Sequence, residues 1–88
     1  MKDEESSLGK DYKDGDIIFE ENSAGREMYI ILTGKAIVIK ERGDVETTLA
    51  TLEEGDFFGE MSLFDNSPRS ATVKALGDVK LLELNQKN

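Results

Sequence analysis

The sequence predicts an all-β fold, a sandwich or barrel built from short strands. Glycines at positions 15, 25, 34, 43, 55, 59 and 77 interrupt the chain, mostly at intervals of nine to twelve residues, as turns between short strands do. Between Ala71 and Ala75, small or apolar residues alternate with Thr72 and Lys74, which is typical of a strand with one buried face. The chain has 88 residues, 38% of them hydrophobic, so one small globular domain is favoured over a disordered chain.

Turns that contain glycine separate the expected strands. The candidate strands are Ile17–Glu20, Met28–Leu32, Lys35–Glu41, Glu46–Leu52, Ala71–Ala75 and Val79–Leu84. A hairpin turn is predicted at Arg42-Gly43-Asp44, and further turns at Asp14-Gly15-Asp16, Thr33-Gly34 and Leu76-Gly77-Asp78. A helix is expected only from Gly59 to Phe64, and it is too short to persist unless it packs against the sheet.

The composition excludes several kinds of chemistry. The chain contains no cysteine, so it has no disulfide and no thiol nucleophile. It also contains no histidine, which is the commonest general base and metal ligand in proteins. Its net charge is −8 and its basic residues are scattered, which argues against direct contact with nucleic acid. No stretch is long and apolar enough to span a membrane, and the acidic start is unlike a signal peptide, so we expect a cytoplasmic protein without membrane contact.

The segment 57–73 combines groups that suit a phosphate and a sugar. Gly59 precedes the predicted helix, whose first N–H groups and positive dipole end favour an anion. Arg69, in a loop stiffened by Pro68, carries a planar fork of donors that matches a phosphate. Glu60 only accepts hydrogen bonds when it is ionised, so it suits a sugar hydroxyl rather than the phosphate.

This segment and several others closely resemble the cyclic nucleotide-binding domain family, from about Tyr12 to Asn85. The matching runs are Lys13-Asp14-Gly15-Asp16-Ile17-Ile18-Phe19, Met28-Tyr29-Ile30-Ile31-Leu32-Thr33-Gly34, Glu54-Gly55-Asp56-Phe57-Phe58-Gly59-Glu60-Met61-Ser62-Leu63 and Pro68-Arg69-Ser70-Ala71-Thr72-Val73. The resemblance implies a double-stranded β-helix (jelly-roll) barrel of about eight strands, with a short helix in the phosphate-binding cassette. It also implies a ligand site formed by Phe58, Gly59, Glu60, Met61, Ser62, Arg69, Ser70 and Ala71.

The resemblance assigns roles to the residues of this site, and each residue also has a simpler interpretation. Glu60 binds the ribose 2′-hydroxyl in the functional interpretation, and is a surface carboxylate in the simpler one. Arg69 binds the exocyclic phosphate oxygens, or is a solvated charge or the partner of a nearby carboxylate such as Asp65. Gly59 lets the phosphate or ribose approach the backbone, or only makes a turn.

The remaining site residues are expected to act through their backbone or from the core. Backbone N–H groups of Ser62, Ser70 and Ala71 complete the phosphate contacts. The Ser70 hydroxyl has alternatives, since it could cap a turn or reach a purine amino group, and Ala71 could simply pack in the core. Met61 is expected in the core, and Phe57-Phe58 in the core and the floor of the pocket.

Together these features predict a sensory domain that binds a 3′,5′-cyclic purine mononucleotide and catalyses no reaction. Cyclic AMP (cAMP) is the first expectation because Arg69-Ser70-Ala71 resembles bacterial cAMP sensors, although a hydroxyl at the Ser70 position also occurs in relatives that prefer cyclic GMP (cGMP). A metal-dependent cupin enzyme shares the barrel, but its metal centre normally needs histidines. A jelly-roll structural or dimerisation module that binds no nucleotide is the other alternative, and it has no need for Glu60 and Arg69.

The chain is expected to be one domain with a short tail. Residues 1–8 are expected to form a flexible N-terminal tail, and residues 9–88 a cyclic nucleotide-binding β-barrel domain excised from a larger protein. Relatives usually follow the barrel with helices, so the lid and output helices are expected from the rest of a parent protein. Glu21-Asn22 stands where many relatives have a glycine, and asparagine tolerates the left-handed backbone of such a turn.

Overall fold

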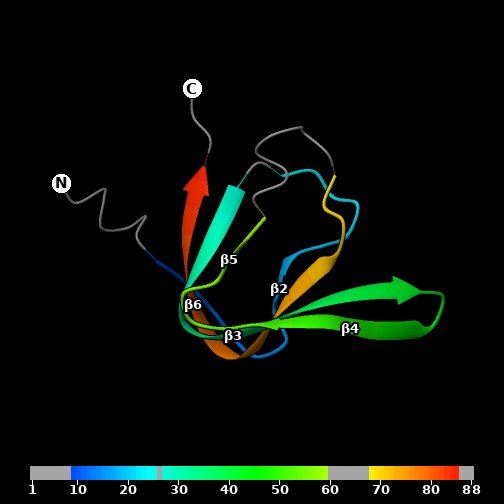
Figure 1. The fold of residues 1–88 in the computed structure, drawn as a ribbon, viewed down its shortest axis with the longest axis horizontal. Coiled ribbons are helices and arrows are strands. Elements are labelled where there is room, and N and C mark those ends of the chain that lie inside the picture. Colours follow the sequence, from blue (N-terminus) through cyan, green and yellow to red (C-terminus); the bar gives the residue numbers. More distant parts are fainter. Residues whose placement is uncertain (1–8, 26, 60–67, 86–88) are drawn as a thin grey trace.

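The computed structural model describes residues 9–25, 27–59 and 68–85, which form six strands in one antiparallel sheet (Figure 1). The strands are β1 (Lys10–Tyr12), β2 (Ile17–Phe19), β3 (Glu27–Arg42), β4 (Val45–Leu52), β5 (Phe57–Phe58) and β6 (Thr72–Asn85). The described residues contain no helix, which confirms the all-β prediction. The helix expected from Gly59 to Phe64 lies, apart from its first residue, outside the described residues.

The two long strands are bent at the sites where turns are predicted. The pairing of β3 with β6 shifts register on both sides of Thr33, and across Gly34 the partner changes from Lys80, which faces Thr33, to Leu76, which faces Lys35. Gly34 and Gly77 both have positive φ, of 94° and 80°, which glycine adopts readily. Figure 1 shows the consequence, since the two halves of β3, and likewise of β6, run in different directions.

Each half of a bent strand has its own additional partner. The first half of β3 pairs with β5 through Tyr29 and Ile30, and its second half pairs with β4. In the same way, the first half of β6 pairs with β2 and the second half with β1. The sheet therefore consists of eight strand segments, as the resemblance to a jelly roll implies.

The hairpin between β3 and β4 turns at Gly43-Asp44, as predicted. Its strand β4 is at the end of the strand order, and all its residues except Leu52 are exposed. Figure 1 shows this hairpin projecting away from the end of β6.

The core lies between the two bent strands and their partners. Its buried residues are Tyr29, Ile31, Ala36, Phe58, Val73, Ala75, Val79 and Leu81. In the fifth candidate strand, Ala71, Val73 and Ala75 are buried as predicted, but the alternation is incomplete because Thr72 is buried as well. The expectation that Phe57 and Phe58 both serve the core is wrong for Phe57, which is 56% exposed. Successive residues of a strand point to opposite faces, so burial of Phe58 turns Phe57 outward.

Among the described residues, no helix is long and apolar enough to cross a bilayer.

Candidate functional site

Arg69 lies just before β6 and is buried, with 3% of its surface exposed. Its Nη2 donates to the backbone carbonyl of Glu27, at 3.0 Å, and approaches the Glu27 carboxylate Oε1 at 3.3 Å. Its Nη1 donates to the backbone carbonyl of Gly59, at 3.2 Å. Because a buried charge is stable only when it is paired and hydrogen-bonded, these acceptors fix the position of the guanidinium.

An aromatic cluster lies beneath the guanidinium. The Arg69 Cζ is 4.0 Å from the centroid of the Phe19 ring, which is a cation–π contact. The Phe19 ring packs on Tyr29 and Phe58, with centroids 6.0 and 5.9 Å away, and those two rings stack at 5.2 Å. Burial raises the pKa of the Tyr29 hydroxyl, and nearby Glu83 raises it further. The aromatic cluster beneath Arg69 therefore carries no negative charge at neutral pH.

Two glycines leave the space that the guanidinium occupies. A Cβ on Gly25 would lie 2.5 Å from the Arg69 Nη2, and a Cβ on Gly59 would lie 3.0 Å from Nη1. Gly59 also has a φ of 87°, which other residues rarely adopt. We call Phe19, Gly25, Glu27 and Gly59 the Arg69 socket.

The backbone of Arg69 is held by the turn that follows β2. The N–H of Asn22 donates to the Arg69 carbonyl at 2.7 Å, and the Arg69 N–H donates to the Ser23 carbonyl at 2.9 Å. Asn22 has a φ of 73°, which confirms that asparagine provides the left-handed backbone expected in this turn. The neighbouring Glu21 N–H donates to the hydroxyl of buried Thr72, at 2.8 Å. Backbone and side chain of Arg69 are thus both fixed.

Two basic residues of β3 form ion pairs with Glu21, which lies in the turn that holds the Arg69 backbone. The carboxylate of Glu21 is 3.3 Å from the guanidinium of Arg42 and 3.6 Å from the ammonium of Lys40. Both cations come from the second half of β3. The net charge of −8 repels an anionic ligand. Pairing of the Glu21 carboxylate with these two cations reduces that repulsion near Arg69.

The structure brings some of the predicted site residues together. Gly59 and Arg69 are in contact, and Phe58 lies in the floor under Phe19. Ser70 is exposed and Ala71 is buried next to Arg69 in the chain. The remaining predicted residues, Glu60, Met61 and Ser62, lie outside the described residues, as does Asp65.

Three members of the socket were missed from the sequence. Phe19, Gly25 and Glu27 are 42 or more positions from Arg69 in the chain. Among the described residues, the carboxylate that pairs with Arg69 is that of Glu27, which lies far from it in the chain. No local signal in the sequence marks these three residues, and Gly25 is one of the predicted turn glycines, although its φ is not positive and its missing Cβ leaves room for Arg69.

The site is suited to hold an anion, because a fixed guanidinium presents parallel donors to a phosphate or carboxylate. Residues 9–88 match the sequence profile of the cyclic nucleotide-binding domain. The chain belongs to this family. A cAMP-dependent protein kinase regulatory subunit of Mucor circinelloides f. lusitanicus is 40% identical over 76 residues, which cover 86% of this chain and 18% of that protein. The domain thus spans about a fifth of the length of this curated relative.

Solved structures agree with this assignment. The regulatory domain of Toxoplasma gondii protein kinase A, solved with cAMP, has a TM-score of 0.82 and 30% identity, over 90% of this chain and 31% of that one. An EAL enzyme, solved in cAMP-bound and cGMP-bound forms, has a TM-score of 0.85 and 42% identity, over 88% of this chain and 21% of that one. These similarities confirm the fold class and show that the chain is a cyclic nucleotide-binding domain.

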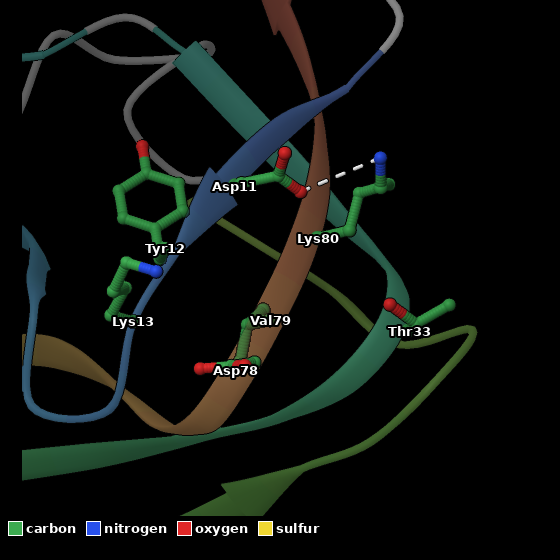
Figure 2. Close-up of a pocket in the computed structure, with 7 residues that line it drawn as sticks. All are labelled: Asp11, Tyr12, Lys13, Thr33, Asp78, Val79 and Lys80. Carbon is green, nitrogen blue, oxygen red and sulfur yellow. Dashed lines mark ion pairs between the residues drawn. The ribbon is translucent and has the colours of Figure 1, made fainter.

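The cyclic nucleotide-binding domain also has a hollow of about 280 Å³ between β1 and the middle of β6 (Figure 2). Asp11 and Lys80 form an ion pair of 3.4 Å at this hollow, and Tyr12 lines it. None of the residues that line it belongs to the Arg69 socket. The hollow is therefore separate from the candidate anion site.

Proposed function

We propose that this domain is the regulatory module of a larger protein, that it binds cAMP in preference to cGMP, and that it catalyses no reaction. The observation that carries the proposal is the fixed guanidinium of Arg69 in its socket beside the end of β5. In this proposal Arg69 binds the exocyclic phosphate oxygens and Glu60 binds the ribose 2′-hydroxyl. Backbone N–H groups of Ser62, Ser70 and Ala71 complete the phosphate contacts.

The choice of cAMP has support from the relatives. The Mucor protein is a regulatory subunit of a cAMP-dependent kinase, and the Toxoplasma domain was solved with cAMP. The EAL enzyme was solved with either nucleotide, so this neighbour does not separate the two. Ser70 is exposed next to Arg69 and is the residue through which a guanine could compete.

The regulatory role has support from the same comparisons. Matched relatives carry this domain as a minor part of a longer chain, and the Mucor relative is a regulatory subunit. The EAL enzyme matches over 21% of its length, so the similarity concerns one part of that enzyme. Nucleotide binding then biases the equilibrium between two conformations of the parent protein.

Calorimetric titration with cAMP, cGMP and AMP tests the proposal. We expect cAMP to bind more tightly than cGMP, but only by roughly tenfold or less (about 1.4 kcal/mol), since the Ser70 hydroxyl offers guanine a partner of its own. AMP should bind most weakly, because its phosphate is not cyclised onto the 3′ oxygen. The unfolding temperature should rise in the same order, because a ligand that binds only the folded state stabilises it. A domain that binds none of the three would be a structural or dimerisation module.

A further inference from the structure

Glu27 contacts Arg69 twice. It is the first residue of β3, and both its carbonyl and its carboxylate lie within hydrogen-bond distance of Nη2. The Glu27 side chain is half-exposed, whereas the Arg69 side chain is buried. The carboxylate is thus the part of the socket through which solvent, or an anion, meets the guanidinium.

A carboxylate and a phosphate bind the same N–H donors of a guanidinium. Each accepts parallel N–H bonds from one edge of the fork. In the structure, the carbonyls of Glu27 and Gly59 already accept from Nη2 and Nη1, and the Glu27 carboxylate takes a further contact of Nη2. A phosphate that binds Arg69 through Nη2 must displace this carboxylate or share Nη2 with it, and two anions side by side repel each other.

We propose that Glu27 is a positioning residue that holds the Arg69 guanidinium when no nucleotide is bound and competes with the nucleotide phosphate for it. This inference rests on the proposed function, since it takes Arg69 as the phosphate-binding residue. Glu27 stabilises the folded protein through Arg69 and lowers the affinity for the ligand. Removing its charge moves these two quantities in opposite directions.

The test is Glu27→Gln, which keeps the size of the side chain and the backbone carbonyl but removes the charge. We expect the dissociation constant for cAMP to fall by about three- to tenfold, because the competing anion is gone. The unfolding temperature without nucleotide should fall by about 4 °C, because the charge-assisted contact is lost. A residue with only a structural role would lower both stability and affinity.

Two further variants separate the effect of the Glu27–Arg69 contact from the effect of a change in net charge. Glu46→Gln removes the same charge from β4, where Glu46 pairs with Lys74 at 3.4 Å, and it should change the affinity less than twofold. Glu27→Asp keeps the charge on a side chain one methylene shorter, so it loses reach to Nη2. Its affinity should lie between those of the wild type and Glu27→Gln.

The outcomes that overturn the inference are distinct from failure of the proposed function. A wild-type protein that binds cAMP, with Glu27→Gln of equal or weaker affinity, shows that Glu27 does not compete. Glu27→Asp with wild-type affinity, or Glu46→Gln as tight as Glu27→Gln, shows that net charge rather than the contact matters. A wild-type protein that binds no cyclic nucleotide overturns the proposed function and this inference together.

Discussion

Asn22 donates its backbone N–H to the carbonyl oxygen of Arg69, over 2.7 Å, from a backbone with a φ of 73°. Arg69 returns a hydrogen bond to Ser23, so the turn and the arginine loop fix each other. The conformation of one asparagine thus sets where the backbone of the candidate phosphate-binding residue lies.

Replacing Asn22 with valine should destabilise the domain and weaken nucleotide binding together. A β-branched residue in the left-handed region costs about 1–3 kcal/mol, and relief of that strain shifts the loop that carries Arg69. Asn22→Gly is the matched control, because glycine adopts this φ without strain. Urea unfolding and titration calorimetry measure both effects. If valine and glycine behave alike, the left-handed conformation is not what positions Arg69.

Replacing Arg69 with lysine should weaken cAMP binding by about 2–4 kcal/mol, because an ammonium loses the two-donor geometry. Lysine is more informative than alanine, which would leave a hole above Phe19 and confuse binding with stability. Arg42→Lys is the control, since Arg42 is an exposed arginine paired with Glu21. Calorimetry on both variants decides the matter, and an unchanged affinity in Arg69→Lys removes Arg69 from the site.

Replacing Glu60 with alanine should weaken binding of cAMP and reduce its advantage over 2′-deoxy-cAMP. A group that reads a hydroxyl discriminates only while it is present, and its loss leaves the deoxy analogue unaffected. Glu54→Ala, at an exposed position of the same segment, should leave the ratio of the two affinities unchanged. Equal binding of the two nucleotides by the wild type would show that Glu60 does not read the ribose.

Replacing Gly25 with alanine should weaken cAMP binding about tenfold and also destabilise the fold, by about 1–2 kcal/mol. The new methyl group would lie 2.5 Å from Nη2, 2.8 Å from Nε and 2.9 Å from Cζ of Arg69, so the buried guanidinium has to leave its hydrogen bonds. Gly9→Ala is the control, because its methyl group meets only the flexible side chains of Lys80 and Leu32. Gly25→Ala with the cAMP affinity of the wild type would contradict the prediction.

Replacing Gly34 with alanine should destabilise the fold more than Gly25→Ala or Gly43→Ala. The Cβ would overlap the Asp78 carbonyl oxygen and touch the Val79 Cα, both of them backbone, at a φ of 94°. We expect a loss of more than about 2 kcal/mol. Gly43→Ala also has a positive φ, of 64°, but its Cβ would meet nothing within 4 Å, so it should lose about 1 kcal/mol. Urea unfolding of the two variants separates backbone strain from overlap.

The sequence predicts the fold class well because its turn residues and its alternation are local signals. The predicted turns at Gly34 and Gly77 are present, but as bends inside the continuous strands β3 and β6. A bend and a turn need the same left-handed glycine, so only the partner strand distinguishes them. Strand β1 was not predicted, because Lys10 and Asp11 give no strand pattern and the strand exists through its pairing with β6.

The candidate site was predictable only where its residues are close in the chain. Gly59 and Arg69 stood out because they share a short motif. Phe19 and Glu27 reach Arg69 through the folding of two distant strands, and neither has a local pattern that marks a partner for an arginine. Such contacts are set by tertiary packing, which a single sequence read in segments does not contain.

Glu27 of β3 is directly paired with Asn85 of β6. The residue that touches the candidate phosphate-binding guanidinium is therefore directly opposite the last described residue of the sheet. A displacement of the β3 backbone at Glu27 changes the ladder hydrogen bonds at that position, because antiparallel partners share them. A shift of the backbone at the anion site therefore reaches the end of β6 through one pair of strand residues, without passing through the rest of the sheet.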